Sequence, residues 1–585
     1  MSATPLPTSQ YELRDNTIQT TPKPNCRRWI KPLAATFAFV GCAAAVAVGI
    51  YSAHSPAFQH DTKNFLDDVA EGKALQVTFK QRQDSASAPS GLPVQGLFFP
   101  REDAAGKLAF DGRISYVHVN QRYNFTLIDD RGYVTIEDAE TGKVVRNDCL
   151  KKDSVPPIQS LTSALVNGRV IDQVGASATI DIDCINGTLV EFVFANEPYI
   201  FCSKAGAAID TVYGQDIEAS LALLEAGSEG VPSRDSLVRP GAESINECKS
   251  LVDGTNAEAP SAKTAFKAFA QRSRDAVNVL AGNPRVSLMA STSCNCGGGK
   301  KACLFVHGLG QTYDGPEQST FSEYFGDIHK RAACCSSIKF MRMDTTNNAW
   351  YDDALPKKMC KAALSMVSSS DKMKMQGIAL ISHSMGNLIV AAAANKGLCA
   401  IDTAKSKWIS LAGPIMGSMS ATTAMSMCRP PDSFRDAIRE VLYSKFAVLT
   451  ALGFCPAKAS LKSLAFKGSS GSNAKLDSLY DRAMQYYADT VSSNICGVSP
   501  TGLVSTSSAK YIALAAFSGH ASGDNDGAVH FDSCRALLPR SKYQTSWSSG
   551  NFYRASLNHA DMTFRNSDGW WGDGRKPTKW FNCQF

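Results

Sequence analysis

A run of uncharged residues near the N-terminus, residues 33 to 53, constrains this chain more than any other feature. As a helix rising about 1.5 Å per residue it reaches roughly 30 Å, the thickness of the hydrocarbon core of a bilayer. Four basic residues precede the run: Lys23, Arg27, Arg28 and Lys31. Since few basic residues follow it closely, residues 1–32 are expected in the cytoplasm and residues 54–585 in the lumen or outside the cell. The pattern predicts a type II single-pass membrane protein of the secretory pathway or cell surface.

A cleaved signal peptide is the alternative to an anchor. The basic region before the apolar run is longer than in most signal peptides, and the run exceeds the usual apolar core of about 7 to 15 residues. Both features favour an uncleaved anchor, which would attach the protein to the membrane through one helix.

The cysteines agree with an exported chain. Of 18 cysteines, Cys26 falls in the expected cytoplasmic tail and Cys42 inside the expected span, which leaves an even sixteen on the exported side. An even number in an oxidising compartment predicts disulfides. The sequons at Asn124 and Asn186 predict glycosylation there.

Charge and composition exclude one class of partner. The net charge is only +6 over 585 residues, and the basic residues are dispersed, so no nucleic-acid-binding surface is expected. A hydrophobic content of 44% with 19% charged residues describes a folded protein, and the length favours two or more domains.

Residues 54–224 are expected to form a β-rich domain. Segments such as ALQVTFKQ, GRISYVHVN and TLVEFVFA alternate apolar and polar residues between turn residues. Four cysteines could crosslink this domain in any of three pairings: Cys149, Cys184, Cys202 and Cys248. Residues 225–265 are rich in Gly, Ser, Pro and Ala and are expected to be a linker.

Residues 266–585 have a different pattern, in which short apolar runs alternate with helical segments. The expected strands are ACLFVHG, SSIKFMRM, IALISHS, KWISLAG and, later, YIALAAFSG. The expected helices are EQSTFSEYFGDIHKRAA, KKMCKAALSMVSS and MGNLIVAAAANKG. This alternation predicts a mostly parallel sheet with helices on both faces. Residues 419–509 interrupt it with amphipathic helices and are expected to be a helical cap.

Ser384 lies where an expected strand is followed directly by an expected helix. The pentapeptide Ser382-His383-Ser384-Met385-Gly386 follows an apolar strand and begins a helix. Such a strand-to-helix turn exposes the hydroxyl and directs a helix N-terminus at it, which suits a nucleophile that must generate and stabilise an oxyanion.

Together with three further motifs, this pentapeptide resembles the lipase and esterase branch of the α/β-hydrolase superfamily. The motifs are the loop His307-Gly308-Leu309-Gly310, the segment Asn525-Asp526-Gly527-Ala528-Val529 and the segment Asn558-His559-Ala560-Asp561. The resemblance implies an oxyanion hole from the Leu309 and Met385 amides. It gives His307, Gly308, Gly310, Ser382, His383 and Gly386 supporting roles. Ser382 departs from the common pattern, in which the pentapeptide begins with Gly.

The same resemblance implies the other two members of a catalytic triad. Asp526 is preferred to Asp524 as the acid because it directly precedes Gly527, and His559 is preferred to His520 as the base because it follows the last expected strand. The resulting chain order is Ser384, Asp526, His559. An EF-hand reading of this acidic loop fails because Ser533 stands where a glutamate is required. Cys294 and Cys296 are expected in disulfides rather than at a metal.

The sequence therefore predicts a membrane-anchored serine esterase or lipase that needs no metal or cofactor and takes an ester or lipid substrate. An acyltransferase with the same triad, and a catalytically silent binding or adhesion protein on this scaffold, remain alternatives. The oligomeric state is left open.

Overall fold

The computed structural model describes residues 64–81, 94–251, 281–428 and 455–585, apart from short gaps within these ranges. The expected tail and transmembrane anchor, residues 1–32 and 33–53, lie outside them. Within the part that is described, every helix is too short or too polar to cross a bilayer.

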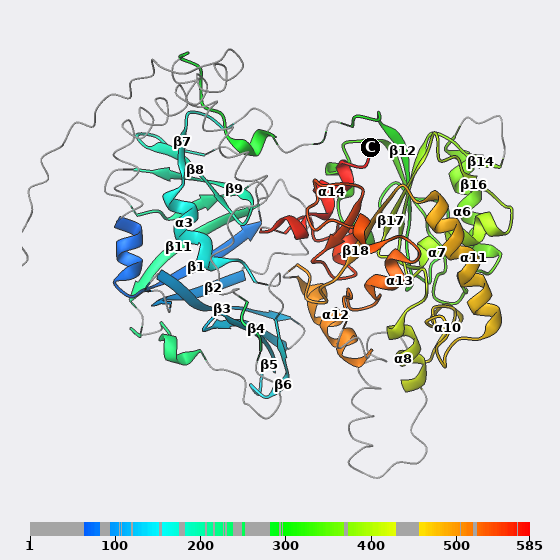
Figure 1. The fold of residues 1–585 in the computed structure, drawn as a ribbon, viewed down its shortest axis with the longest axis horizontal. Coiled ribbons are helices and arrows are strands. Elements are labelled where there is room, and N and C mark those ends of the chain that lie inside the picture. The colour runs from blue at the N-terminus through cyan, green and yellow to red at the C-terminus, as the bar shows by residue number, and fades with distance from the viewer. Residues whose placement is uncertain are drawn as a thin grey trace, which may run out of the picture.

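The N-terminal part, here called the β domain (residues 64–251), is built on an antiparallel sheet of eleven strands (Figure 1). The strands of its first half are β1 (Lys73–Gln81), β2 (Val94–Glu102), β3 (Leu108–His118), β4 (Gln121–Ile128), β5 (Arg131–Asp138) and β6 (Val144–Cys149). Those of its second half are β7 (Arg169–Ile171), β8 (Thr188–Phe194), β9 (Glu197–Ser203), β10 (Thr211–Tyr213) and β11 (Ile217–Glu225).

The chain winds through this sheet from the middle outwards and back. It starts at β1, reaches one edge at β6, crosses to the other edge at β7, and returns to β11, which pairs with β1. The crossing segment carries a short helix, α3 (Leu161–Val166), and packs on the apolar face of the sheet. Alternation along the strands supplies this face, with Val77, Phe192 and Phe201 buried.

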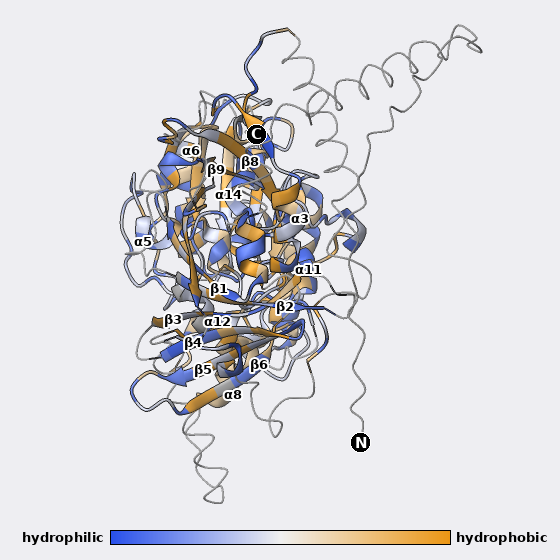
Figure 2. Cartoon of the chain, turned by 90° about the vertical axis from the view of Figure 1, so that its left-hand side faces the viewer, coloured by the Kyte–Doolittle hydropathy of each residue, from blue (hydrophilic) through white to orange (hydrophobic). Residues whose placement is uncertain are grey.

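The second part, here called the C-terminal domain (residues 294–585), contains a separate sheet of six parallel strands. In sheet order these are β13 (Cys335–Phe340), β12 (Lys301–Val306), β15 (Ile378–His383), β17 (Lys407–Leu411), β18 (Ser493–Gly497) and β19 (Phe552–Ala555). One face is covered by α6 (Ala354–Ser365), α7 (Met385–Asn395) and α11 (Ala474–Thr490). The other face packs against α5 (Ser322–Phe325) and α14 (Pro577–Asn582). In Figure 2, where the β domain faces the viewer, hydrophobic segments lie among its strands.

The fold class expected from the sequence is contradicted: it was an α/β-hydrolase domain with a mostly parallel sheet and a helical cap, preceded by a transmembrane helix and a β-rich domain. The dominant sheet is antiparallel, with eleven strands against six in the parallel sheet. The described residues, which do not include residues 33–53, contain no helix that can span a membrane. The alternation of strands and helices after residue 300 is a local pattern and gives no information about the sheet that precedes it. The sequence therefore did not indicate that the antiparallel sheet has more strands than the parallel one.

Three elements of the C-terminal domain also differ from expectation. Residues 419–509 are not one helical insertion: after α8 (Met419–Met427), α10 (Ala459–Ser463) and α11 they contain β18, a strand of the sheet. The apolar segment YIALAAFSG belongs to a helix, α12 (Thr506–Phe517), which begins with a capping box at Ser505. The long helix expected at residues 317–333 ends early because Gly326 takes a positive φ of 64°.

The expected linker, residues 225–265, is in part folded onto the β domain. Nη2 of Arg234 lies 2.6 Å from a carboxylate oxygen of the buried Asp111, and Cys248 forms a disulfide with Cys149. Met289, further along, packs with Ile200 of the same domain. The linker was predicted because residues 225–265 lack an apolar period, but ion pairs and disulfides hold a segment in place without such a period.

All sixteen cysteines expected in disulfides are paired, which confirms that prediction. The eight pairs are Cys149–Cys248, Cys184–Cys202, Cys294–Cys583, Cys296–Cys334, Cys303–Cys335, Cys360–Cys399, Cys428–Cys455 and Cys496–Cys534. Such a set is typical of proteins that fold in the secretory pathway.

The two sequons differ in their surroundings. Asn186 lies exposed in the turn before β8. Asn124 is only 7% exposed on β4, and its side-chain oxygen accepts a hydrogen bond from Ser115. Of the two sequons, only the one at Asn186 is therefore exposed in the folded protein.

Candidate active site

Ser384 lies in the turn between β15 and α7 with a strained backbone. Its φ of 54° and ψ of −129° fall in a region that residues other than glycine rarely occupy. The Ser384 amide donates a hydrogen bond of 2.9 Å to the carbonyl of Leu411 on the neighbouring strand β17. This turn places the serine hydroxyl beyond the carboxyl end of the sheet.

Two glycines allow the backbone to approach this turn closely. A Cβ atom on Gly308 would lie 2.5 Å from Cβ of Ser384, and one on Gly386 would lie 2.7 Å from the carbonyl oxygen of Val306. Neither position can accept a larger residue without moving the turn. The loop of residues 307–310 is therefore held against Ser384.

Ser382, which stands where the motif usually has glycine, is bound from two sides. Its hydroxyl donates to Oδ1 of Asn387 at 2.6 Å and accepts a 2.7 Å hydrogen bond from the indole nitrogen of Trp408. The Asn387 amide also contacts the carbonyls of Ser384 and Leu411. The extra side chain at this position thus stabilises the turn.

The structure brings Ser384, His559 and Asp526 together. Oγ of Ser384 lies 2.9 Å from Nε2 of His559, and Nδ1 of His559 lies 2.8 Å from Oδ2 of Asp526. The amides of Ala528 and Val529 donate to the other oxygen of Asp526, at 2.9 and 2.7 Å. Asp526 can therefore hold the His559 ring with Nδ1 protonated, which leaves Nε2 free to accept the serine proton.

The competing residues lie elsewhere or outside the described residues. Asp524 forms ion pairs with Arg554 at 2.9 Å and with Arg540 at 3.5 Å. His530 caps the short helix α13 (Phe531–Arg535). His520 lies outside the described part of the chain.

No protein-family model matches the chain, and neither does any curated protein. The chemistry of this site therefore has to be derived from its own atoms.

His307 orders the loop that approaches Ser384. Its Nε2 accepts a 3.1 Å hydrogen bond from the Met343 amide, so Nδ1 carries the proton and donates to the carbonyl of Gly308 at 2.9 Å. Burial lowers the pKa of His307 to about 4, which keeps the ring neutral. Leu309 follows Gly308 in this loop, and Met385 is the first residue of α7, directly after Ser384.

A hydrogen-bond chain that the sequence did not reveal joins this loop to His559. The Gly308 amide donates to the Tyr324 hydroxyl at 2.8 Å, and that hydroxyl lies 2.7 Å from Nδ1 of His383. Nε2 of His383 donates to the carbonyl of His559 at 2.9 Å. Burial holds the pKa of His383 well below its usual range, so this ring is neutral, with its proton on Nε2. His383 is thus a structural link between the loop and the base.

The residue two positions after His559 is a buried carboxyl group. Asp561 accepts hydrogen bonds from the amides of Leu503 and Asn558 and from the side chain of Asn566. Burial raises its pKa to about 6 despite these donors. Asp561 fixes the segment that carries His559.

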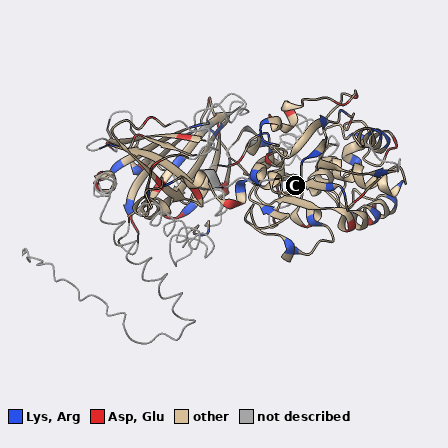
Figure 3. Cartoon of the chain, turned by 90° about the horizontal axis from the view of Figure 1, so that it is seen from above, with Lys and Arg blue, Asp and Glu red and all other residues tan. Residues whose placement is uncertain are grey.

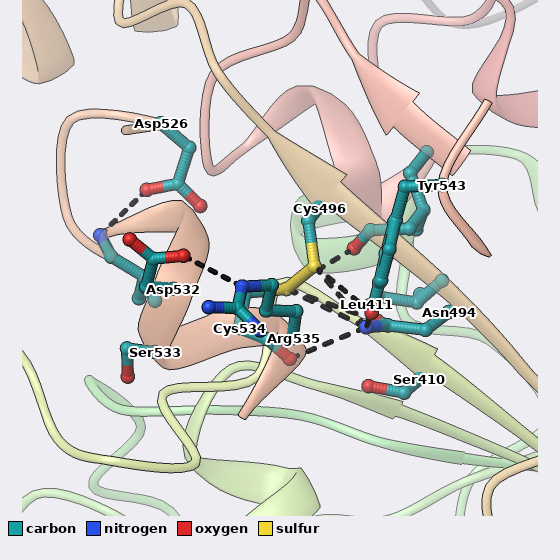
Figure 4. The surroundings of a disulfide bond; sticks show 12 residues. Ser410, Leu411, Asn494, Cys496, Asp526, Asp532, Ser533, Cys534, Arg535 and Tyr543 are labelled. Atoms are coloured by element: carbon teal, nitrogen blue, oxygen red, sulfur yellow. Dashed lines mark hydrogen bonds and ion pairs between the residues drawn. A yellow bond between two sulfur atoms is a disulfide. The ribbon is translucent and has the colours of Figure 1, made fainter. Parts of the chain in front are cut away.

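A disulfide supports the acid from the other side (Figure 4). Cys496 at the end of β18 is bonded to Cys534 on α13, the helix that follows the Asp526 loop. Asn494 donates to the Tyr543 hydroxyl at 2.6 Å beside this bond. The disulfide therefore links β18 to the helix that directly follows the loop of Asp526.

The C-terminal segment connects the site to the β domain. The Gly572 amide donates to the carbonyl of Ala195 at 3.0 Å, and the ammonium groups of Lys576 and Lys579 lie 3.1 and 2.9 Å from the carboxylate of Glu197. These cations lower the pKa of Glu197 against the effect of burial. The described residues contain no cluster of three or more His, Cys, Asp or Glu that could hold a metal.

Proposed function

We propose that this protein is a serine hydrolase that cleaves carboxylic esters through an acyl-enzyme. The observation that carries the proposal is the continuous hydrogen-bonded series from Ser384 through His559 to Asp526, built at a strained turn. In this arrangement a base lies within reach of the hydroxyl, and the base is itself oriented by a buried acid.

The reaction follows from these positions. His559 takes the proton of Ser384 as Oγ attacks the ester carbonyl, and Asp526 stabilises the imidazolium that forms. The amides of Leu309 and Met385 donate to the oxyanion. His559 then protonates the leaving alcohol, and water, activated by the same histidine, releases the acid.

The substrate class is proposed to be a lipid ester, on the expectation that residues 33–53 anchor a lumenal or extracellular catalytic domain to the membrane as a type II protein. The disulfides support the secretory pathway. Acyl transfer to an alcohol would use the same residues, and competition between water and added alcohols would separate it from hydrolysis. Basic and acidic residues are interspersed along both domains (Figure 3), which gives no support to a nucleic-acid substrate.

Labelling of the full-length protein with a fluorophosphonate tests the proposal, because this probe reacts with an activated serine. We expect labelling of the wild type and none of Ser384→Ala or His559→Ala. Ser426→Ala and His329→Ala, at exposed positions outside the triad, serve as matched controls. A folded wild type that does not label would rule out the proposed activity and favour a silent binding protein.

A further inference from the structure

Arg565 carries a positive charge to which the proposed mechanism gives no role. It lies six positions after His559 and is partly buried. Its Cζ atom lies 5.2 Å from the centre of the Tyr324 ring, and its Nε donates a hydrogen bond of 2.9 Å to the hydroxyl of Thr563. Within the part of the chain that the structure describes, the guanidinium forms no ion pair. Its charge is therefore not neutralised by these contacts.

The contacts of Tyr324 place this charge close to the triad. The Tyr324 hydroxyl lies 2.7 Å from Nδ1 of His383, and the His383 ring lies 4.7 Å from the ring of His559. The same hydroxyl accepts a hydrogen bond from the amide of Gly308, which packs directly against Ser384. The ring on which the guanidinium is stacked thus contacts both the oxyanion loop and the residue that supports the base.

Lys510 on α12 brings a second positive charge to this region. Its ammonium nitrogen lies 5.8 Å from the centre of the Tyr511 ring, and the Tyr511 ring lies 5.7 Å from the ring of His559. Partial burial, followed by the charge of Arg565, lowers the pKa of Lys510. The two cations are therefore close enough to affect each other, and both lie beside aromatic rings that neighbour the triad.

These groups are more accessible than the triad itself. Ser384 and His559 are each only 6% exposed, whereas Arg565 and Lys510 are partly exposed. An ester bound at the Ser384 hydroxyl has to extend outwards from this buried position, past the groups that surround it. The hydrogen bond to Thr563 uses only Nε of Arg565, which leaves the two terminal nitrogens for a ligand. Such a pair of donors matches the oxygens of a carboxylate or a phosphate.

We propose that Arg565, assisted by Lys510, selects esters that carry a carboxylate or phosphate group. This inference rests on the proposed hydrolase function and narrows its substrate class. Arg565 does not touch the reacting atoms, so it acts on the recognition of the substrate and not on the chemistry at Ser384.

The test compares matched anionic and neutral esters with the full-length protein. Mono-para-nitrophenyl glutarate carries a carboxylate on the acyl side, and para-nitrophenyl butyrate is its neutral partner. On the alcohol side, para-acetoxybenzoate and para-acetoxyphenyl phosphate carry the two kinds of anion, and para-acetoxybenzamide is their neutral partner. Because the esters differ in intrinsic reactivity, the measured quantity is the anionic-to-neutral ratio of kcat/KM and its change between wild type and variant.

We expect Arg565→Gln to lower this ratio by about tenfold or more for at least one anionic ester, because a charge-assisted pair of hydrogen bonds is lost. Arg565→Lys should retain part of the ratio, and Lys510→Gln should lower it by a smaller factor. Arg482→Gln, at an exposed arginine on α11, is the matched control and should leave the ratio unchanged. Thermal unfolding verifies that each variant is folded, and the anionic ester that responds identifies the anion and its side of the ester.

Two results would overturn the inference. The first is a folded Arg565→Gln with wild-type ratios for all three anionic esters. The second is an equal loss of kcat/KM for anionic and neutral esters, which would show that Arg565 only supports the Tyr324 ring. Fluorophosphonate labelling separates these results from a failure of the proposed function. A wild type that labels refutes the specificity alone, whereas one that neither labels nor hydrolyses any of the esters refutes both.

Discussion

Tyr511 and Ile512 are neighbours on α12, yet their side chains pack into different parts of the protein. The Tyr511 ring lies 5.7 Å from the His559 ring, whereas Ile512 is buried in the hydrophobic core of the β domain. Tyr511 also packs against Gly527, directly after the triad acid. Because these two residues are adjacent on α12, the packing of the β domain affects the positions of His559 and Asp526. Figure 1 shows α12 on the side of the C-terminal domain that faces the β domain.

This connection predicts the effect of a cavity at Ile512. Ile512→Ala should lower the free energy of unfolding by about 2 to 5 kcal/mol and should also slow fluorophosphonate labelling, because Tyr511 loses its support. Ile512→Val, which removes one methyl group, should cost about 0.5 to 1.5 kcal/mol. Denaturant unfolding and labelling rates measure both effects. A labelling rate that is unchanged in a destabilised Ile512→Ala would contradict the coupling.

The assignment of the acid predicts a contrast between two neighbouring aspartates. Asp526→Asn should lower the labelling or hydrolysis rate by about 10⁴, because an amide favours the wrong tautomer of His559. The fold should survive, since the Asn oxygen can still accept from Ala528 and Val529. Asp524→Asn loses the ion pairs with Arg554 and Arg540, which lie outside the triad, and should leave the rate unchanged. Equal losses in the two variants would show that the acid is assigned wrongly.

The Tyr324 hydroxyl should matter although it does not touch the substrate. Tyr324→Phe leaves the Gly308 amide and Nδ1 of the buried His383 without their partner, and we expect a loss of about 1 to 3 kcal/mol in unfolding free energy. Labelling should slow as the loop that carries Leu309 shifts. Tyr313→Phe, at a side chain that is 49% exposed, is the matched control. Wild-type stability and labelling in Tyr324→Phe would refute this role.

The raised pKa of Asp561 predicts a pH dependence of stability. Between about pH 4 and pH 6 the folded protein keeps a proton on Asp561 that the unfolded chain has lost, so the free energy of unfolding falls as pH rises through this window and is flat above it. The contribution is at most about 3 kcal/mol. Asp561→Asn should remove it, because Asn does not titrate and its oxygen can accept from Leu503 and Asn558. Parallel unfolding curves for the two proteins from pH 4 to 7 would exclude this contribution.

The features that were predicted correctly are those that depend on neighbours in sequence. The strand, Ser384 and the helix of the turn follow from a local pattern, and the paired state of sixteen cysteines follows from their number and compartment. The run YIALAAF was misassigned because a short apolar segment without charges fits a buried strand and a helix equally well. Its capping serines, Ser505 and Ser508, were the signal that could have settled it.

The remaining features depend on contacts between distant residues. Tyr324 and His383 are 59 positions apart, and nothing in either segment indicates a shared hydrogen bond. The pairing of β1 with β11 and the disulfide partners are likewise set by how the chain closes in space, and alternating patterns specify which face of a strand is buried but not which strand lies beside it.

The Cys294–Cys583 disulfide joins the two ends of the C-terminal domain covalently. Because it joins residues 289 positions apart, the whole domain, Ser384, Asp526 and His559 included, lies within one closed loop of chain. A single proteolytic cut inside that loop opens the ring without releasing a fragment, so a nicked protein would keep all three residues on one molecule. Only reduction would separate the pieces, and a nicked chain would migrate as one band on a non-reducing gel and as two after a thiol is added.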